Sequence, residues 1–271
     1  MAKTKIEVVK KSLPVVPRVE EDWEKQLAAD AKADKATFTS GVARITVDGM
    51  KFVVDGTKTG KNEILVVVVE HAWSKEYYER AWQPGVTSTP ECYAFGHSEK
   101  GLIAHAAAPD KQNVKDDGTS HCDDCRHNVF GSAVVGRGKR CADKPRLLVV
   151  LGHDVEASTA QKVGTYQLTV PPSSLKGFSQ YLGSLGDFTP HGNVREAVTK
   201  ITVEPLSGKS GHALVFEFDS LVPREAMPVL LKRKEGAYEQ LTQPFPNLEE
   251  KEAEAPAKPV KGQGSNPKGK R

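Results

Sequence analysis

The chain has 271 residues, of which 38% are hydrophobic and 27% charged, and its formal net charge is only +3. This length is enough for one large domain or two small ones with a real core. The small net charge does not mark the whole chain as a nucleic-acid binder, so any such function must depend on local clusters of charge. The longest apolar run, residues 64–69 (ILVVVV), is too short to span a membrane.

The first part of the chain predicts a polar arm followed by β structure. Residues 1–36 form the arm, and its Trp23, Leu27 and Ala31 repeat at helical spacing. Residues 37–55 alternate apolar and polar residues around Asp48-Gly49, which predicts a hairpin. Residues 62–73 then predict a buried central strand.

Residues 73–145 have no regular pattern and contain all four cysteines and many glycines. Beyond them, residues 146–155 and 165–170 predict strands, and a Pro-Pro stop precedes a helix capped by Ser173 or Ser174. Two further strands and a short helix over about 223–234 follow. The tail, 247–271, is rich in Lys, Glu, Pro and Gly, which favours disorder.

We therefore expect a mainly β fold with a few helices, either an OB-like antiparallel barrel or a small sandwich. Its core would span residues 37–246, and an insertion at about 73–145 would be stabilised by zinc. A long irregular insertion needs such a fixing device, because it has no core of its own.

The spacing of the cysteines indicates a metal site. Cys122 and Cys125 form a CxxC knuckle, Cys141 follows, and Cys92 precedes them. Four thiolates make a closed tetrahedral site of the structural kind, for which zinc is the favoured ion. The sequence also shows no secretory pattern, and in an intracellular setting cysteines favour metal over disulfides.

Several alternatives to this ligand set stay open. His97, His121 or His127 could replace Cys92, an iron–sulfur cluster could use the same four thiolates, and the cysteines could be buried thiols without metal.

The segment between the knuckle and the next strand is basic and rich in glycine. Its only acid is Asp143. Backbone flexibility and clustered cations suit contact with phosphates, although a solvated loop is the alternative. The candidate phosphate contacts are Arg126, Arg137, Lys139, Arg140, Lys144 and Arg146.

Aromatic residues crowd the same part of the chain. Single-stranded nucleic-acid binders combine cations with aromatic rings on which bases stack, whereas a core position is the alternative for each ring. The candidates for stacking are Trp82, Tyr93 and Phe130. No GxSxG, HExxH or GxGxxG motif is present, and the histidines are scattered, so we expect no enzymatic activity.

Three motifs resemble a group of bacteriophage-encoded proteins. They read PECYAFG at 90–96, CDDCRHNVFGS at 122–132 and GRGKRC at 136–141, and YQLTVPPSSLKGFSQYL at 166–182 is also similar. The resemblance implies a viral setting and the host cytoplasm. The chain looks more loosely like phage single-stranded DNA-binding proteins that insert a zinc site into an OB fold. Those proteins have a strongly acidic tail, whereas residues 249–271 of this chain are not strongly acidic.

These features together lead us to expect a single-stranded DNA-binding protein that acts in phage DNA replication or recombination. We expect its zinc to be structural and expect no contact with a membrane. RNA is the alternative nucleic acid. The competing expectations are a zinc-stabilised adaptor that binds replication or transcription proteins, and a virion component.

Overall fold

The computed structural model describes residues 42–80, 88–134, 136–155, 164–208 and 211–245. The chain divides into two units, Met1–Gly41 and Val42–Arg271. The polar arm and the tail, for which we expect a helix and disorder, lie outside the described residues. The second unit is mainly β, as the sequence predicts. Its strands are β1 (Arg44–Asp48), β2 (Lys51–Val54), β3 (Thr57–Lys58), β4 (Glu63–Tyr77), β5 (Cys92–Gly96), β6 (Cys141–Asp143), β7 (Arg146–Leu151), β8 (Tyr166–Thr169), β9 (Ala197–Pro205) and β10 (His212–Leu221).

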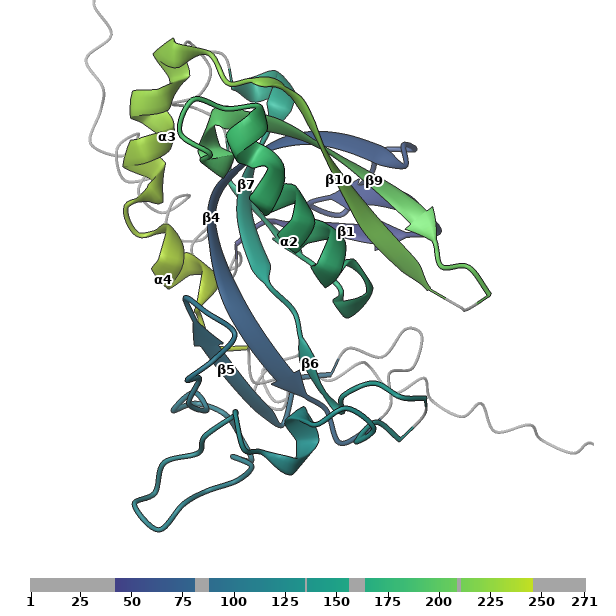
Figure 1. Ribbon diagram of the computed structural model, residues 1–271, viewed down its shortest axis with the longest axis vertical. Coiled ribbons are helices and arrows are strands. Elements are labelled where there is room, and N and C mark those ends of the chain that lie inside the picture. The colour runs from purple at the N-terminus through teal and green to yellow at the C-terminus, as the bar shows by residue number, and fades with distance from the viewer. Residues whose placement is uncertain (1–41, 81–87, 135, 156–163, 209–210, 246–271) are drawn as a thin grey trace, which may run out of the picture. The chain divides into compact units, whose positions relative to one another are not determined.

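The strands form one mixed sheet in the order β10-β9-β4-β7-β8-β1-β2-β3, and β5 and β6 also pair with β4 (Figure 1). Only β1 and β8 pair in parallel among the described strands. Strands β10 and β3 end this order, so the described strands form a mixed sheet that is not closed, and the expected OB-like barrel or sandwich is not confirmed. The physical reason is that helices, rather than closure of the sheet, cover its faces.

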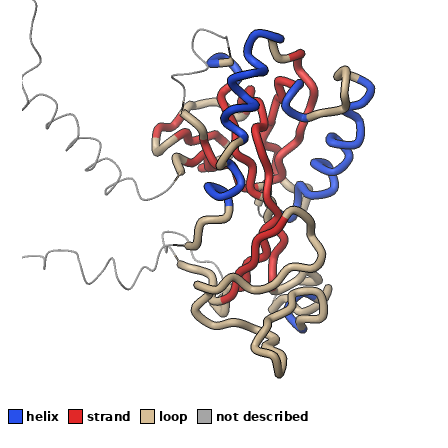
Figure 2. Tube along the Cα trace, turned by 90° about the vertical axis from the view of Figure 1, so that its left-hand side faces the viewer, coloured by secondary structure: helices blue, strands red, loops and turns tan. Residues whose placement is uncertain are grey.

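Helices pack on both faces of the sheet (Figure 2). Helix α2 lies on one face, while α3 and α4 lie on the other, in separate apolar clusters. The α-helices are α2 (Leu175–Ser184), α3 (Met227–Lys234) and α4 (Ala237–Leu241), and the 3₁₀ turns are η1 (Arg126–Asn128), η2 (Gly152–Asp154), η3 (Pro172–Ser174), η4 (Leu185–Asp187), η5 (Val194–Glu196) and η6 (Arg224–Ala226).

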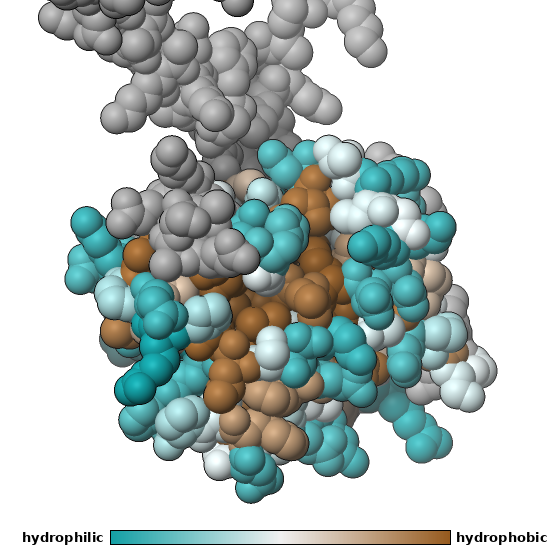
Figure 3. Space-filling model, turned by 90° about the horizontal axis from the view of Figure 1, so that it is seen from above, coloured by the Kyte–Doolittle hydropathy of each residue, from teal (hydrophilic) through white to brown (hydrophobic). Residues whose placement is uncertain are grey.

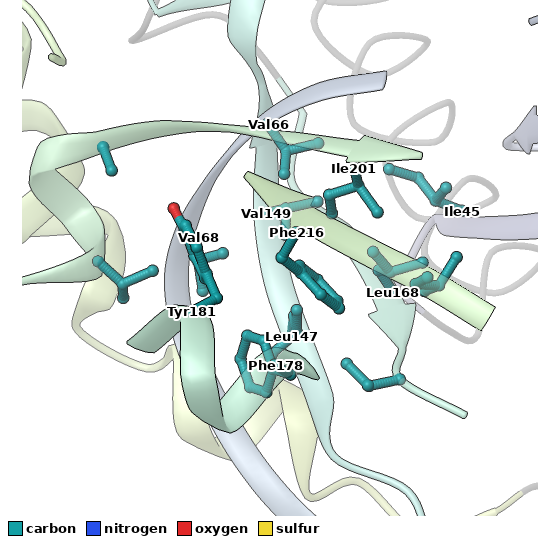
Figure 4. Close-up of a cluster of buried hydrophobic side chains, with 14 of the residues drawn as sticks. Ile45, Val66, Val68, Leu147, Val149, Leu168, Phe178, Tyr181, Ile201 and Phe216 are labelled. Atoms are coloured by element: carbon teal, nitrogen blue, oxygen red, sulfur yellow. The ribbon is translucent and has the colours of Figure 1, made fainter. Parts of the chain in front are cut away.

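The apolar run in β4 is explained by this two-sided burial. Val66 and Val68 face α2, whereas Val67 and Val69 face α3. Side chains alternate along a strand, so a strand buried on both faces reads as a continuous apolar run. On the α2 side, the ring centroids of Phe178 and Phe216 lie 4.9 Å apart (Figure 4).

The predicted hairpin is present, and its turn has the geometry that a two-residue loop requires. Strands β1 and β2 pair with Asp48 opposite Lys51. Gly49 and Met50 both have positive φ, 55° and 66°. This is the conformation of a type I′ turn, whose twist matches that of the flanking strands.

Ser174 occupies the predicted N-cap position of α2, but its side chain makes no capping hydrogen bond. Its Oγ accepts the N–H of Leu214 at 2.6 Å, and Ser173 Oγ donates to the carbonyl of His212 at 2.8 Å. The two hydroxyls therefore tie the start of the helix to β10, because that neighbouring strand brings its backbone groups within reach.

Strand β4 is longer than the sequence predicts, and it positions the cysteine-rich region. Its first part pairs with β9 and β7, and its last part, from Trp73 to Tyr77, pairs with β5 and β6. The register shifts between Val68 and Glu70, which marks a bulge. The strand thus carries residues 88–145 away from the main core (Figure 1). No helix in the described part of the chain is long and apolar enough to cross a membrane.

Candidate metal centre and basic loop

Two of the four cysteines are fixed by the end of β4. Cys92 on β5 and Cys141 on β6 both pair with Tyr77. Because β5 and β6 pair with the same residues of β4, they lie on its two sides. Residues directly opposite one another in a sheet point to the same face, so both thiols share the face of the Tyr77 side chain.

The other two cysteines form a tight turn. The N–H of Cys122 donates to the carbonyl of Leu102 at 2.9 Å, and the N–H of Cys125 donates to the carbonyl of Cys122 at 3.3 Å. Asn128 closes the turn, because its N–H donates to the Cys125 carbonyl at 2.9 Å and its Nδ2 donates to the Cys122 carbonyl at 2.8 Å. The CxxC segment is therefore held by its own backbone.

All four cysteines are buried, unpaired by disulfides, and line one cavity of about 20 Å³. A cavity of this size has room for one ion or water molecule. The N–H of Gln112 donates to Cys92 Sγ at 3.4 Å, the kind of contact that stabilises thiolate ligands. The structure therefore gathers the thiols that the sequence singles out.

No group of three or more His, Cys, Asp or Glu side chains in the described ranges is arranged to hold a metal as it stands. The donor set nevertheless fits a structural metal, because four buried sulfur atoms around one cavity are the ligands that zinc prefers.

The histidines named as substitutes for Cys92 differ in position. His121 and His127 line the cavity, and the His127 ring stacks on Tyr77 at 4.4 Å. His97 instead stacks on Tyr238 of α4 at 4.0 Å and does not line the cavity. Cys92 lines the cavity together with His121 and His127, so its wall offers the fourth thiol and two imidazoles.

Burial hinders ionisation of three of these thiols, those of Cys92, Cys122 and Cys141. Burial and the neighbouring Cys92 together raise the pKa of Cys122 to about 12, although Lys75 acts to lower it. Burial likewise raises the pKa of Cys141 and of Cys92. Since the thiolate is the form that binds metal, positive charge from an ion and from nearby cations is needed to bring four thiolates together.

Two of the candidate phosphate contacts are committed to ion pairs near the sheet. Arg146 is buried, lies 3.7 Å from Glu76, and donates to the carbonyl of Leu241 at 2.9 Å. Lys144 pairs with the same Glu76 at 2.9 Å. Both cations are thus held by one buried carboxylate, with Arg146 buried and Lys144 partly exposed.

Four candidates lie nearer the surface. Arg126 and Arg137 are exposed. Lys139 is partly buried, pairs with Asp143 at 2.9 Å, and lies 5.2 Å from the centre of the Phe130 ring. Arg140 donates to the carbonyl of Glu79 at 2.9 Å. The loop thus keeps cations at its surface, although fewer than the sequence count implies.

The three aromatic candidates for base stacking differ in where they lie. Phe130 is 78% exposed, and Tyr93 is 1% exposed. The Tyr93 ring packs against His105 and Phe95, at 5.2 and 5.4 Å between ring centres, so it offers no face to a base. Trp82 lies outside the described residues.

Sequence reasoning missed Lys75 and Asn128, which link the cysteines to the basic loop. Asn128 Oδ1 accepts hydrogen bonds from Lys75 Nζ at 3.2 Å and from Lys139 Nζ at 3.1 Å. No local signal marked Lys75, because a charged residue beyond Trp73 looks exposed until its partner Asp143 is known.

No family model, curated protein or solved structure matches this chain.

Proposed function

We propose that the chain binds single-stranded DNA through the loop of residues 126–140, which a structural zinc ion holds in shape, and that it serves phage DNA replication or recombination. The observation that carries the proposal is Phe130. A phenylalanine ring that is 78% exposed, with a lysine amine over it and two exposed arginines in the same loop, combines the two elements of a single-strand binding surface.

The proposed phosphate contacts are Arg126, Arg137, Lys139 and Arg140. Arg146 and Lys144 are left out because both are held in ion pairs with Glu76, and Tyr93 is left out because it is buried. Each remaining cation that meets a phosphate releases a counterion, so affinity should fall as salt rises.

Zinc has a structural role in this proposal. A zinc ion bound by Cys92, Cys122, Cys125 and Cys141 would cross-link β5, the knuckle and β6. The protein would supply four thiolates and leave no open position for catalysis. The basic loop runs between Cys125 and Cys141, so both of its ends would be fixed.

The experiment is a fluorescence-anisotropy titration of labelled oligonucleotides with three proteins. These are the unsubstituted chain, Phe130→Ala, and the matched control Phe188→Ala, which removes another exposed ring, one that stacks on Phe218. Loss of one stacked base costs about 1–3 kcal/mol, which corresponds to about 5- to 160-fold, so Phe130→Ala should weaken binding by this factor and Phe188→Ala should not.

The proposal fails if the unsubstituted chain binds no oligonucleotide at low salt, or if the two variants behave alike. Unlabelled DNA and RNA competitors of the same sequence distinguish the two nucleic acids.

A second candidate function, a protein-binding adaptor, is favoured by a different surface. An open groove of about 680 Å³ lies where β10 ends and α3 begins, with Leu221 and Leu231 exposed along it and Arg224 at its edge. Figure 3 shows hydrophobic residues gathered in a band across the molecule seen from above.

The partner that fits is an acidic amphipathic helix, because the groove is apolar and α3, which supplies Leu231, ends in a basic turn. A titration with an acidic amphipathic peptide and a basic one of equal apolar content tests this. Binding of the acidic peptide alone, lost in Leu231→Glu, supports the adaptor; equal binding of both peptides, or none, refutes it.

A further inference from the structure

Lys75 is a buried cation beside the cysteine cavity. The residue is 3% exposed, and its amine pairs with Asp143 Oδ1. Asp143 also pairs with Lys139 through Oδ2 at 2.9 Å. Two lysine amines therefore share one carboxylate, which leaves an excess of one positive charge at this place.

The strand register places this charge on the face of the cysteines. In β4, Lys75 precedes Tyr77 by two residues, so their side chains point to the same face. Lys75 pairs with Asp143 on β6, and Tyr77 pairs with Cys141 on the same strand and with Cys92 on β5. The amine thus lies one step along the sheet from the two thiols.

The neighbouring acid cannot balance the excess. Glu76 points to the opposite face, where it pairs with Lys144 and Arg146. Buried lysines are rare unless they are paired, and Lys75 shares its acid with Lys139, so a second negative group beside it would be favourable. The cysteine cavity is the group next to Lys75 that can become negative.

A divalent ion held by four thiolates has a net charge of about −2, since each thiolate contributes −1. Replacement of one thiolate by a neutral histidine would halve that charge. A buried lysine beside the site therefore favours the more negative centre, the one with four thiolates.

We propose that Lys75 is the counter-charge of an anionic four-thiolate metal centre and that it favours Cys92 over His121 or His127 as the fourth ligand. This inference depends on the metal centre proposed above and is independent of DNA binding. Lys75 is a positioning residue here, because it acts on the ligands and does not itself bind the ion. Residues of this kind change metal affinity about 10- to 100-fold when they are replaced.

The test measures Co²⁺ and Zn²⁺ affinity by competition with a chromophoric chelator, on the full chain and on variants with opposite charge changes. Lys75→Met removes a positive charge and should weaken binding about tenfold. Asp143→Asn removes a negative charge and should strengthen binding. Lys75→Arg keeps the charge and should restore affinity. Lys144→Met is the matched control, because it removes a cation on the other face and should leave affinity unchanged.

The expected changes in metal affinity have opposite signs, which distinguishes an effect of charge from an effect of structure. A merely structural role would make both Lys75→Met and Asp143→Asn weaken metal binding. That result would overturn the inference. The absorption of the Co²⁺ form provides a second readout, because sulfur-to-cobalt charge transfer grows with the number of thiolates. Lys75→Met should lose this absorption in part.

The two proposals can fail separately. If the unsubstituted chain binds neither metal, the metal centre and this inference fall together. If it binds metal and Lys75→Met binds equally well, this inference alone falls.

Discussion

Cys92 and Cys141 pair with the same residue, Tyr77, from the two sides of β4. The sheet therefore holds two of the four cysteines in register, and the CxxC turn has only to bring its own two thiols to them. Removal of a knuckle ligand should leave this strand pairing intact while releasing the turn.

We expect Cys125→Ser to lose stoichiometric zinc and to loosen residues 97–140, because a metal cross-link replaces the missing core of this region. Metal analysis of purified protein and limited proteolysis check this. Val114→Ala, an exposed change in the same segment, is the control. Zinc retained by Cys125→Ser would contradict the assignment of this ligand.

Neighbouring leucines of α3 should differ sharply in their contribution to stability. Leu230 is 0% exposed and packs on Val67 and Val69, whereas Leu231 is 52% exposed. Leu230→Ala should lower the free energy of unfolding by about 2–5 kcal/mol, since it removes buried methyl groups and leaves a cavity. Leu231→Ala should change it by less than about 0.5 kcal/mol. Urea denaturation distinguishes the two, and equal losses would contradict the packing of α3.

Two arginines that the sequence groups together should behave in opposite ways. Arg146→Ala should destabilise the fold by about 3–5 kcal/mol, because it leaves Glu76 in a buried ion pair without one partner. Arg137→Ala should leave the unfolding midpoint unchanged, since the residue is exposed, and should reduce the salt dependence of DNA binding. Thermal melting and anisotropy at several salt concentrations measure both effects. A stable Arg146→Ala chain would show that this pair is not needed.

The turn before β9 should depend on pH. Glu196 accepts hydrogen bonds from the N–H groups of His191 and Asn193 and completes a capping box. The hydrogen bond from the His191 ring lowers the pKa of Glu196 below its usual value. The folded carboxyl is therefore more acidic than the unfolded one. Its stabilisation is present above the unfolded pKa, about 4.3, and is lost as pH falls through the folded pKa.

Glu196→Gln should lower stability at pH 7 by about 0.5–1 kcal/mol, the contribution of a cap. The difference from the unsubstituted chain should shrink as the pH falls below about 4. Chemical denaturation at several pH values measures it, and a difference that stays constant with pH would rule out the carboxylate as the cause.

The sequence predicts those parts of the fold whose partners are local or whose pattern is strong. The hairpin predicted around Asp48-Gly49 needs only its own residues, although its two-residue turn is Gly49-Met50. The run at 64–69 is apolar on both faces because helices cover both. The extension of β4 through Lys75 and Glu76 could not be predicted, since charged residues look exposed until Asp143, Lys144 and Arg146 are known to pair with them.

The same limit applies to the site. The spacing of the cysteines predicted which residues line one cavity. It could do so because the two thiols of a CxxC pair have a chemical use in few arrangements other than a shared site. The count of loop cations overstated the number of free cations, since Glu76, the acid that pairs with Arg146 and Lys144, lies far away in the sequence. Phe130 is exposed and Tyr93 is buried, and no local sequence pattern distinguishes the two.

Because β4 is continuous, the cysteine-rich region is not a module that can be separated from the main sheet. A single strand of 15 residues belongs both to the main sheet and to the cysteine-rich region, with no linker between the two. A fragment cut at residue 73 would therefore take half a strand and leave unpaired backbone on both pieces. The transplantable unit is β4 together with β5, β6 and β7, and any graft of the loop onto another protein would have to begin with a sheet that can accept them.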